Sequence, residues 1–251
     1  MVFWLAVWQV ASLLVGQELL VPAPSVVLTT LAGLFGTPAF WQVTGWSLVR
    51  VLAGFVAGVV VGCLAAMLTV RSRVADALLS PLLRVVRAAP VASFIILALV
   101  WIPTGRLPAF ISFLMVVPVV WDNMAHGIAG QDRALLEMAA VFRFGRWQTL
   151  RRVRLPLLLP FFAAACTTGM GLAWKSGVAA EVISRPELSI GGELQDAKVY
   201  LDTPEVFAWT ITVVALSLLL ESALRWGAAH VTRRLSGGPV PVGEGTSDAG
   251  A

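Results

Sequence analysis

Six charge-free apolar runs divide this 251-residue chain, and they constrain its fold more than any other feature. A helix that spans a membrane needs about 20 mostly apolar residues. The second, third and fifth runs reach that length range unaided, whereas the fourth and sixth must extend into flanking residues. The runs predict an all-α polytopic membrane protein with about six transmembrane helices, at residues 1–17, 51–70, 88–105, 107–121, 155–174 and 206–220.

The composition excludes a soluble globular protein. Hydrophobic residues make up 58% of the chain and charged residues 13%, whereas soluble domains are about half apolar and a quarter charged. The first run is expected to be an uncleaved helix and not a signal peptide. No basic residue precedes its apolar core, and no small-x-small cleavage site precedes Glu18.

No catalytic or metal-binding set can be built from the sequence. Cys63 and Cys166 lie inside apolar runs without a CxxC pattern, which favours buried small hydrophobes over a disulfide or a metal site. His126 and His230 are isolated near predicted helix ends. The sequence contains no G-x-x-x-x-G-K-[ST] phosphate-binding loop. We therefore expect no cofactor on this chain, and any ATP that drives it must bind to another chain.

The basic residues predict the orientation in the membrane. Thirteen of the 18 Lys and Arg residues fall in three segments that would all lie in the cytoplasm if both termini do, as the positive-inside rule requires. These are Arg71, Arg73, Arg84, Arg87, Arg133, Arg143, Arg146, Arg151, Arg152, Arg154, Arg225, Arg233 and Arg234. The acidic segment 187–205 would then face outward. Because the arginines are spread over three loops, they do not indicate nucleic-acid binding.

The chain divides into a predicted transmembrane domain at 1–234 and a tail at 235–251. Gly, Pro and Ser dominate the tail, which is expected to be a disordered cytoplasmic segment. Within the second apolar run, Gly54, Gly58 and Gly62 recur every four residues, the small-xxx-small pattern that lets two helix backbones approach closely. Glycine is also simply frequent in membrane helices, and the sequence leaves that alternative open.

A basic amphipathic loop at about 126–155 is the segment most suited to contact a partner. Its apolar residues recur at three- and four-residue intervals, as on one stripe of a helix; they are Leu135, Met138, Val141, Phe142, Leu150 and Val153. The simpler alternative is a basic loop held near anionic lipid by its arginines.

The order of residues in this loop resembles the signature of binding-protein-dependent ABC importer permeases, E-A-A-x3-G-x9-I-x-L-P. The matching residues are Glu137, Ala139, Val153, Leu155 and Pro156. Met138 replaces the first alanine and Arg143 replaces the glycine, while Gly145 follows two residues later. Because glycine adopts positive φ without a steric cost, we interpret Gly145 as a shifted helix break.

The resemblance implies the architecture of a type I ABC importer permease with a cytoplasmic coupling helix. In that family the loop docks in a groove of a separate ATPase, which holds ATP and Mg. The apolar anchors for docking would be Leu136, Met138, Ala139, Ala140 and Phe142. The resemblance further implies a second copy of the chain (a homodimer), an extracytoplasmic substrate-binding protein, and location in a bacterial cytoplasmic (inner) membrane.

Four further stretches are similar to the nitrate/sulfonate/taurine branch of these permeases, which implies a small anionic substrate. They are residues 19–27, 47–55, 80–92 and 173–183. Together with the loop they cover most of the chain in the expected order. In this family the permease is a transport subunit and performs no catalysis itself.

The fifth apolar run ends in AWKSGVAAE, which places Lys175 and Glu181 within or near the membrane. Such groups by default face a bundle interior or an aqueous path. We predict that Lys175 contacts an anionic substrate, with Ser176, Trp174 and Glu181 also lining the path. The alternatives are that the charges extend to the interface, or that Glu181 pairs with another helix. For Arg50 a structural role at a helix end or between helices is expected.

Two other classes of protein were weighed against the importer permease. An ion-coupled secondary transporter would need inverted repeats and carboxylates at the membrane midplane; no clear repeat occurs, and Glu181 is the only good candidate. An intramembrane enzyme would need a nucleophile–base pair or a metal cluster in the spans. Only the importer permease requires the loop at 137–156.

Overall fold

The computed structural model describes residues 2–130, 138 and 141–235, and every regular element in these ranges is a helix. Four helices are long and apolar enough to cross a membrane. They are α3 (Pro38–Arg71), α6 (Leu107–Ala129), the continuous helix Arg146–Ser184 that contains α9 (Leu155–Ser184), and α11 (Thr203–Leu235). The predicted all-α polytopic architecture is therefore confirmed.

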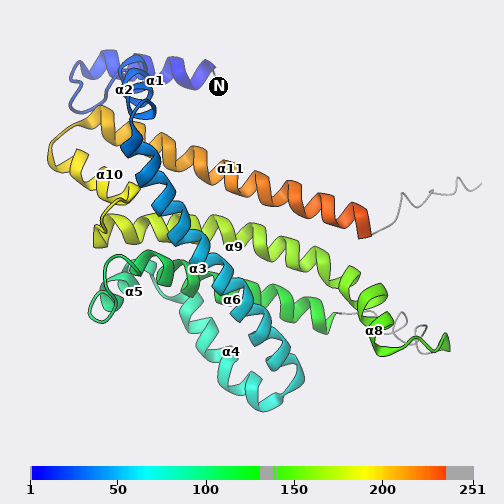
Figure 1. The fold of residues 1–251 in the computed structure, drawn as a ribbon. Coiled ribbons are helices and arrows are strands. Elements are labelled where there is room, and N and C mark those ends of the chain that lie inside the picture. The colour runs from blue at the N-terminus through cyan, green and yellow to red at the C-terminus, as the bar shows by residue number, and fades with distance from the viewer. Residues whose placement is uncertain (1, 131–137, 139–140, 236–251) are drawn as a thin grey trace, which may run out of the picture.

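The first apolar run is too short to span. It forms α1 (Val2–Val15), a helix of 14 residues, which is shorter than the roughly 17 residues that a span requires. Gly16 ends the helix at φ +62, and α2 (Pro24–Phe35) starts with a proline at its first turn. The predicted first transmembrane helix is thus replaced by two short helices at one end of the bundle (Figure 1).

The third apolar run does not form a single helix either. Only α5 (Val91–Ala98) arises from it, and α5 is bent by 103° from the preceding α4 (Arg73–Ala88). The break falls at Ala89 and Pro90, since a residue before proline is disfavoured in the helical region. If this bent pair is one span, the described residues hold five candidate spans, not six.

The core of the bundle is the contact between α3 and α6, and the predicted glycine face makes it. A Cβ atom added to Gly58 would lie 2.7 Å from Cβ of Val116, and one added to Gly62 would lie 2.7 Å from Cβ of Val120. Only glycine permits this approach of the two backbones. Helix α9 packs against both α3 and α6: a Cβ atom added to Gly177 would lie 2.6 Å from Val51 of α3, and Ser112 of α6 donates a hydrogen bond to the carbonyl of Ala173 at 3.0 Å.

The two ends of the bundle differ in chemistry. Figure 1 shows α10 (Ile190–Val199), α2 and the start of α11 at one end, and α8 (Arg146–Thr149) at the other. The α8 end also receives the C-terminus of α6. Arginines gather in the segment leading to α9, which includes the short π-helix Leu150–Arg154. The end that carries α8 is called the loop end below, and the opposite one the α10 end.

We predict that Gly58→Ala lowers the free energy of unfolding by about 1–3 kcal/mol, because the added methyl group overpacks the α3–α6 contact. A detergent-micelle unfolding titration with sodium dodecyl sulfate measures the change. Gly45→Ala is the matched control on the same helix, since a Cβ there meets no atom within 4 Å. Equal stability of the two variants would contradict the close approach.

Candidate functional site

The predicted coupling segment is partly described. Met138 and residues 141–156 are described, whereas Glu137, Ala139 and Ala140 lie outside the described residues. The Phe142 amide donates to the Met138 carbonyl at 3.0 Å, which is one turn of helix. Phe142 and Trp147 are 67% and 70% exposed. Large exposed aromatic side chains at the loop end suit insertion into a partner's groove.

Arg143, at the position of the signature glycine, has the backbone conformation that the glycine would adopt. Its φ is +52, a left-handed conformation that costs a non-glycine residue about 1–2 kcal/mol. Gly145 is instead extended, with φ −62, and caps the N-terminus of α8. The interpretation of Gly145 as a shifted helix break is therefore wrong. The left-handed residue is Arg143, so the break occurs at the signature position although no glycine occupies it.

The rest of the signature lies where the helix passes from the loop into the bundle. Val153 is buried at 9% exposure in the π-helix, and α9 begins with Leu155 and Pro156. In a regular α-helix the Pro156 ring would press on the carbonyl of Arg152. The wider π turn relieves this clash, so the helix continues from Arg146 to Ser184 despite the proline.

A buried polar cluster lies near the α10 end. Glu181 is fully buried, and its Oε2 accepts hydrogen bonds from Ser47 Oγ at 2.8 Å and from the Gly191 amide at 3.2 Å. Ser47 Oγ in turn accepts from the Ile190 amide at 2.9 Å. Arg50 Nη1 lies 3.7 Å from Glu181 Oε1. The cluster ties α3 to α9 and to the start of α10.

Arg50 also donates to the carbonyls of Glu187 at 2.7 Å and Leu188 at 2.9 Å. It thereby holds the α9–α10 connection against α3, and the structural role expected for it is confirmed. Glu181 pairs with α3 within the same protomer, which is the alternative that the sequence left open for it.

The four residues predicted to line a path do not share one surface. Trp174 is fully buried and donates from Nε1 to the Val213 carbonyl at 2.9 Å, and Ser176 is buried against the Ala173 carbonyl. Only Lys175 is exposed. It lines a cavity of about 390 Å³ between α9 and α11, together with Thr167, Thr168, Gly171, Leu172 and Glu221.

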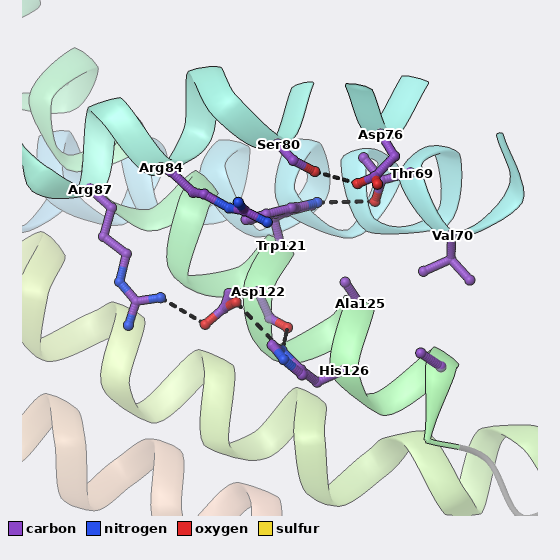
Figure 2. Close-up of a pocket in the computed structure, with 11 residues that line it drawn as sticks. Thr69, Val70, Asp76, Ser80, Arg84, Arg87, Trp121, Asp122, Ala125 and His126 are labelled. Atoms are coloured by element: carbon purple, nitrogen blue, oxygen red, sulfur yellow. Dashed lines mark hydrogen bonds and ion pairs between the residues drawn. The ribbon is translucent and has the colours of Figure 1, made fainter. Parts of the chain in front are cut away.

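A larger cavity of about 540 Å³ lies between the loop-end parts of α3 and α6 and the length of α4. Figure 2 shows Arg84 extending from α4 toward Trp121 of α6, and Arg87 extending toward Asp122 of α6, which contacts His126. Arg87 Nη1 contacts Asp122 Oδ2 at 2.7 Å. Trp121 Nε1 donates to Thr69 Oγ1 of α3 at 3.0 Å. The cavity thus has a charged wall and an aromatic wall.

Arg84 and Arg87 lie on a helix, whereas the sequence predicts a cytoplasmic loop for them. Arg84 lies eleven residues beyond the start of α4, which is about 17 Å along the helix. Their predicted cytoplasmic side stays a prediction. A sequence signal for the cavity was present and was missed. Asp76, Ser80, Arg84 and Arg87 stand at intervals of four, four and three residues, which places all four on one helix face.

Comparison with known proteins identifies the family. Residues 58–237 match the model of the binding-protein-dependent transport system inner membrane component. The chain belongs to this family. A probable ABC transporter permease of Brucella melitensis biotype 1 is 30% identical over 192 residues, which cover 74% of this chain and 76% of the relative. The protein is therefore a membrane-spanning transport subunit of the ABC importer permease type.

Two further relatives have named transport systems. The taurine transport system permease protein of Escherichia coli K12 is 27% identical over 225 residues, covering 87% of this chain and 81% of the relative. The bicarbonate transport system permease protein of Synechococcus elongatus is 28% identical over 199 residues, covering 78% and 70%.

A solved structure confirms the fold of the permease. A chain of the MetNI methionine ABC transporter, crystallised in an inward-facing conformation, is similar with a TM-score of 0.54 at 16% identity. The similarity covers 78% of this chain and 93% of that one. The type I permease architecture implied by the loop signature agrees with this neighbour.

We predict that Glu181→Ala lowers the unfolding free energy of the permease by about 3–5 kcal/mol, because it removes the acceptor of the buried Ser47 hydroxyl and Gly191 amide and the carboxylate beside the partly buried Arg50. Glu181→Gln retains an acceptor for Ser47 and Gly191 and should lose less. Thermal unfolding in detergent measures both. Glu187→Gln is the control, since only the backbone carbonyl of Glu187 takes part. A Glu181→Ala protein as stable as the control would show that the cluster is not structural.

Proposed function

We propose that this permease transmits the motion of a separate ATP-binding subunit through residues 137–156, and that two copies of the chain together enclose the substrate path. The observation that carries this proposal is the pair of exposed aromatic residues at the loop end, Phe142 and Trp147, of which Trp147 lies on the continuous helix Arg146–Ser184 that contains α9. A docked partner at that segment would act directly on a spanning helix.

ATP and Mg would bind to the partner, because the sequence contains no phosphate-binding loop. The chain contributes no catalytic group to this function. Its role is to form the path and to alternate the access to it. A single copy carries one coupling loop, so a homodimer matches two ATPase subunits.

We propose a bacterial cytoplasmic membrane as the location, with the loop end in the cytoplasm. The basic residues at Arg71, Arg73, Arg146, Arg151 and Arg152 support this orientation through the positive-inside rule. The end of α11 would then be cytoplasmic, whereas α1, which does not span, would lie at the outer side, so the predicted cytoplasmic N-terminus is not proposed. The predicted tail at 235–251 stays a prediction, because residues 236–251 lie outside the described residues.

The α10 end would receive the extracytoplasmic binding protein. Acidic side chains gather on and around α10, among them Glu187, Glu193, Asp196 and Glu205. Burial raises the pKa of Glu193, and the nearby Glu205 and Asp196 carboxylates raise it further. A basic surface on the binding protein would complement this charge and speed the encounter.

For the substrate we propose a small anion such as a sulfonate, taurine, nitrate or bicarbonate. The named transport systems of the relatives support this class. The exposed cations in the two described cavities, Lys175 in the smaller and Arg84 and Arg87 in the larger, support it from the structure.

We predict that Glu137→Arg removes the ATPase from a pull-down of the permease with the ATPase co-expressed beside it, because the charge reversal falls in the docking segment. Glu187→Arg makes the same charge change at the α10 end and should retain the ATPase. If neither the natural chain nor Glu187→Arg recovers an ATPase, the coupling proposal is wrong.

We predict that Lys175→Ala reduces anion uptake by the assembled complex about tenfold while the ATPase still co-purifies, because a cation is lost from the proposed path. Arg73→Ala, which removes an exposed cation of α4 outside both cavities, is the control. Uptake of labelled taurine or bicarbonate into reconstituted vesicles provides the measurement. Unaltered uptake kinetics would remove Lys175 from the path.

A further inference from the structure

The larger cavity contains a guanidinium without a carboxylate partner. Arg87 is paired with Asp122. The Asp76 carboxylate accepts a hydrogen bond from Ser80. Among the described residues, four ion pairs occur, and Arg84 is in none of them. Arg84 lines the cavity with its side chain exposed, so its five donors remain available to a ligand.

The position of Arg84 makes lipid an implausible neighbour for its charge. It lies about 17 Å along α4 from Arg73, on the polar face of this helix. The opposite face of the same helix is apolar and exposed, with Val74 at 70%, Leu78 at 69% and Val85 at 63%. The polar face of α4, which carries Arg84, is thus the face that lines the cavity.

The cavity also selects for ligand shape. Trp121 forms a flat wall that is only 7% exposed, and its single donor is already taken by Thr69. Asp122 is held by Arg87 and lies 3.5 Å from His126 Nδ1, so its charge is balanced within the wall. The planar fork of a guanidinium matches two oxygens of one carboxylate, sulfonate or bicarbonate.

We propose that the cavity between α3, α4 and α6 is a binding site for a small oxyanion on the transport path, with Arg84 as its charged ligand and Arg87 positioned beside it by Asp122. At the loop end, the site would hold the anion on the cytoplasmic half of the path. This site rests on the function proposed above, because it assumes that the permease transports an anion. It adds to that function a defined binding site for the anion.

The test measures the charge selectivity of the cavity with a cysteine reporter. Ala125 lines the cavity and is small, so Ala125→Cys is introduced after Cys63 and Cys166 are replaced by alanine. Membranes that contain the assembled complex are treated with negatively charged sulfonatoethyl methanethiosulfonate, or with positively charged trimethylammonioethyl methanethiosulfonate. The ratio of the two labelling rates reports the local potential.

We expect the negative reagent to label the introduced cysteine faster than the positive reagent does. Arg84→Gln should lower the ratio of the negative to the positive labelling rate about fivefold, because it removes one positive charge close to this cysteine. Arg84→Lys should keep the ratio, because it retains the positive charge. It is the control for a folding defect caused by substitution at this position. Arg73→Gln removes the same charge from α4 outside the cavity and should leave the ratio unchanged. Ethanesulfonate or bicarbonate should slow labelling in the Arg84 protein but not in Arg84→Gln, and choline should slow neither.

Three outcomes would overturn the site: no preference for the negative reagent, an equal fall in Arg73→Gln, or no protection by either anion. These results would leave ATPase recovery intact and so count against the site alone. Loss of the ATPase from the natural chain would instead count against the proposed function, whatever the labelling shows. Protection by ethanesulfonate but not bicarbonate, or the reverse, would support the site and identify its anion.

Discussion

The close approach of α3 and α6 is the contact on which the rest of this permease depends. A bilayer offers no water to unpaired backbone groups, so the chain must satisfy them within helices, and helices in lipid associate through packing. The face of Gly54, Gly58 and Gly62 brings the two backbones together. That contact fixes where α6 presents Trp121 and Asp122, and it also forms the surface of α3 and α6 on which α9 packs.

Charges in the bundle fall into two kinds that are distinguished by their partners. Glu181 and Arg50 are engaged by Ser47 and by backbone groups around α10, so their charges hold the fold together. Arg84 is exposed in a cavity and lacks a carboxylate partner among the described residues. An ionisable group costs free energy within a membrane. An anionic ligand in the cavity would supply the partner that Arg84 lacks there.

The sequence predicted what depends on local pattern. The glycine period gave the packing face, the apolar runs gave the helical class, and the loop signature gave the family. The sequence does not show which residues contact one another, because the helical period gives the face on which a residue lies but not its neighbours. It therefore predicts loop positions for Arg84 and Arg87, whereas both lie on α4. The positive φ of Arg143 was missed for a related reason: propensity favours Gly145, and tertiary structure overrides it.

The position of the loop between α6 and α9 connects the two halves of the proposed mechanism. One end of the loop follows the last turn of α6, a few residues beyond Asp122 and His126 of the cavity. The other end enters α9 through the π turn at Leu150–Arg154, where an irregular hydrogen-bond ladder lets Pro156 sit in a continuous helix. In the proposed mechanism, a displacement of the docking segment would therefore act on the cavity wall through α6, and on the packing of α6 through α9. Because the Arg87–Asp122 pair bridges α4 and α6, movement of α6 relative to α4 would change the very surface that Arg84 presents to an anion.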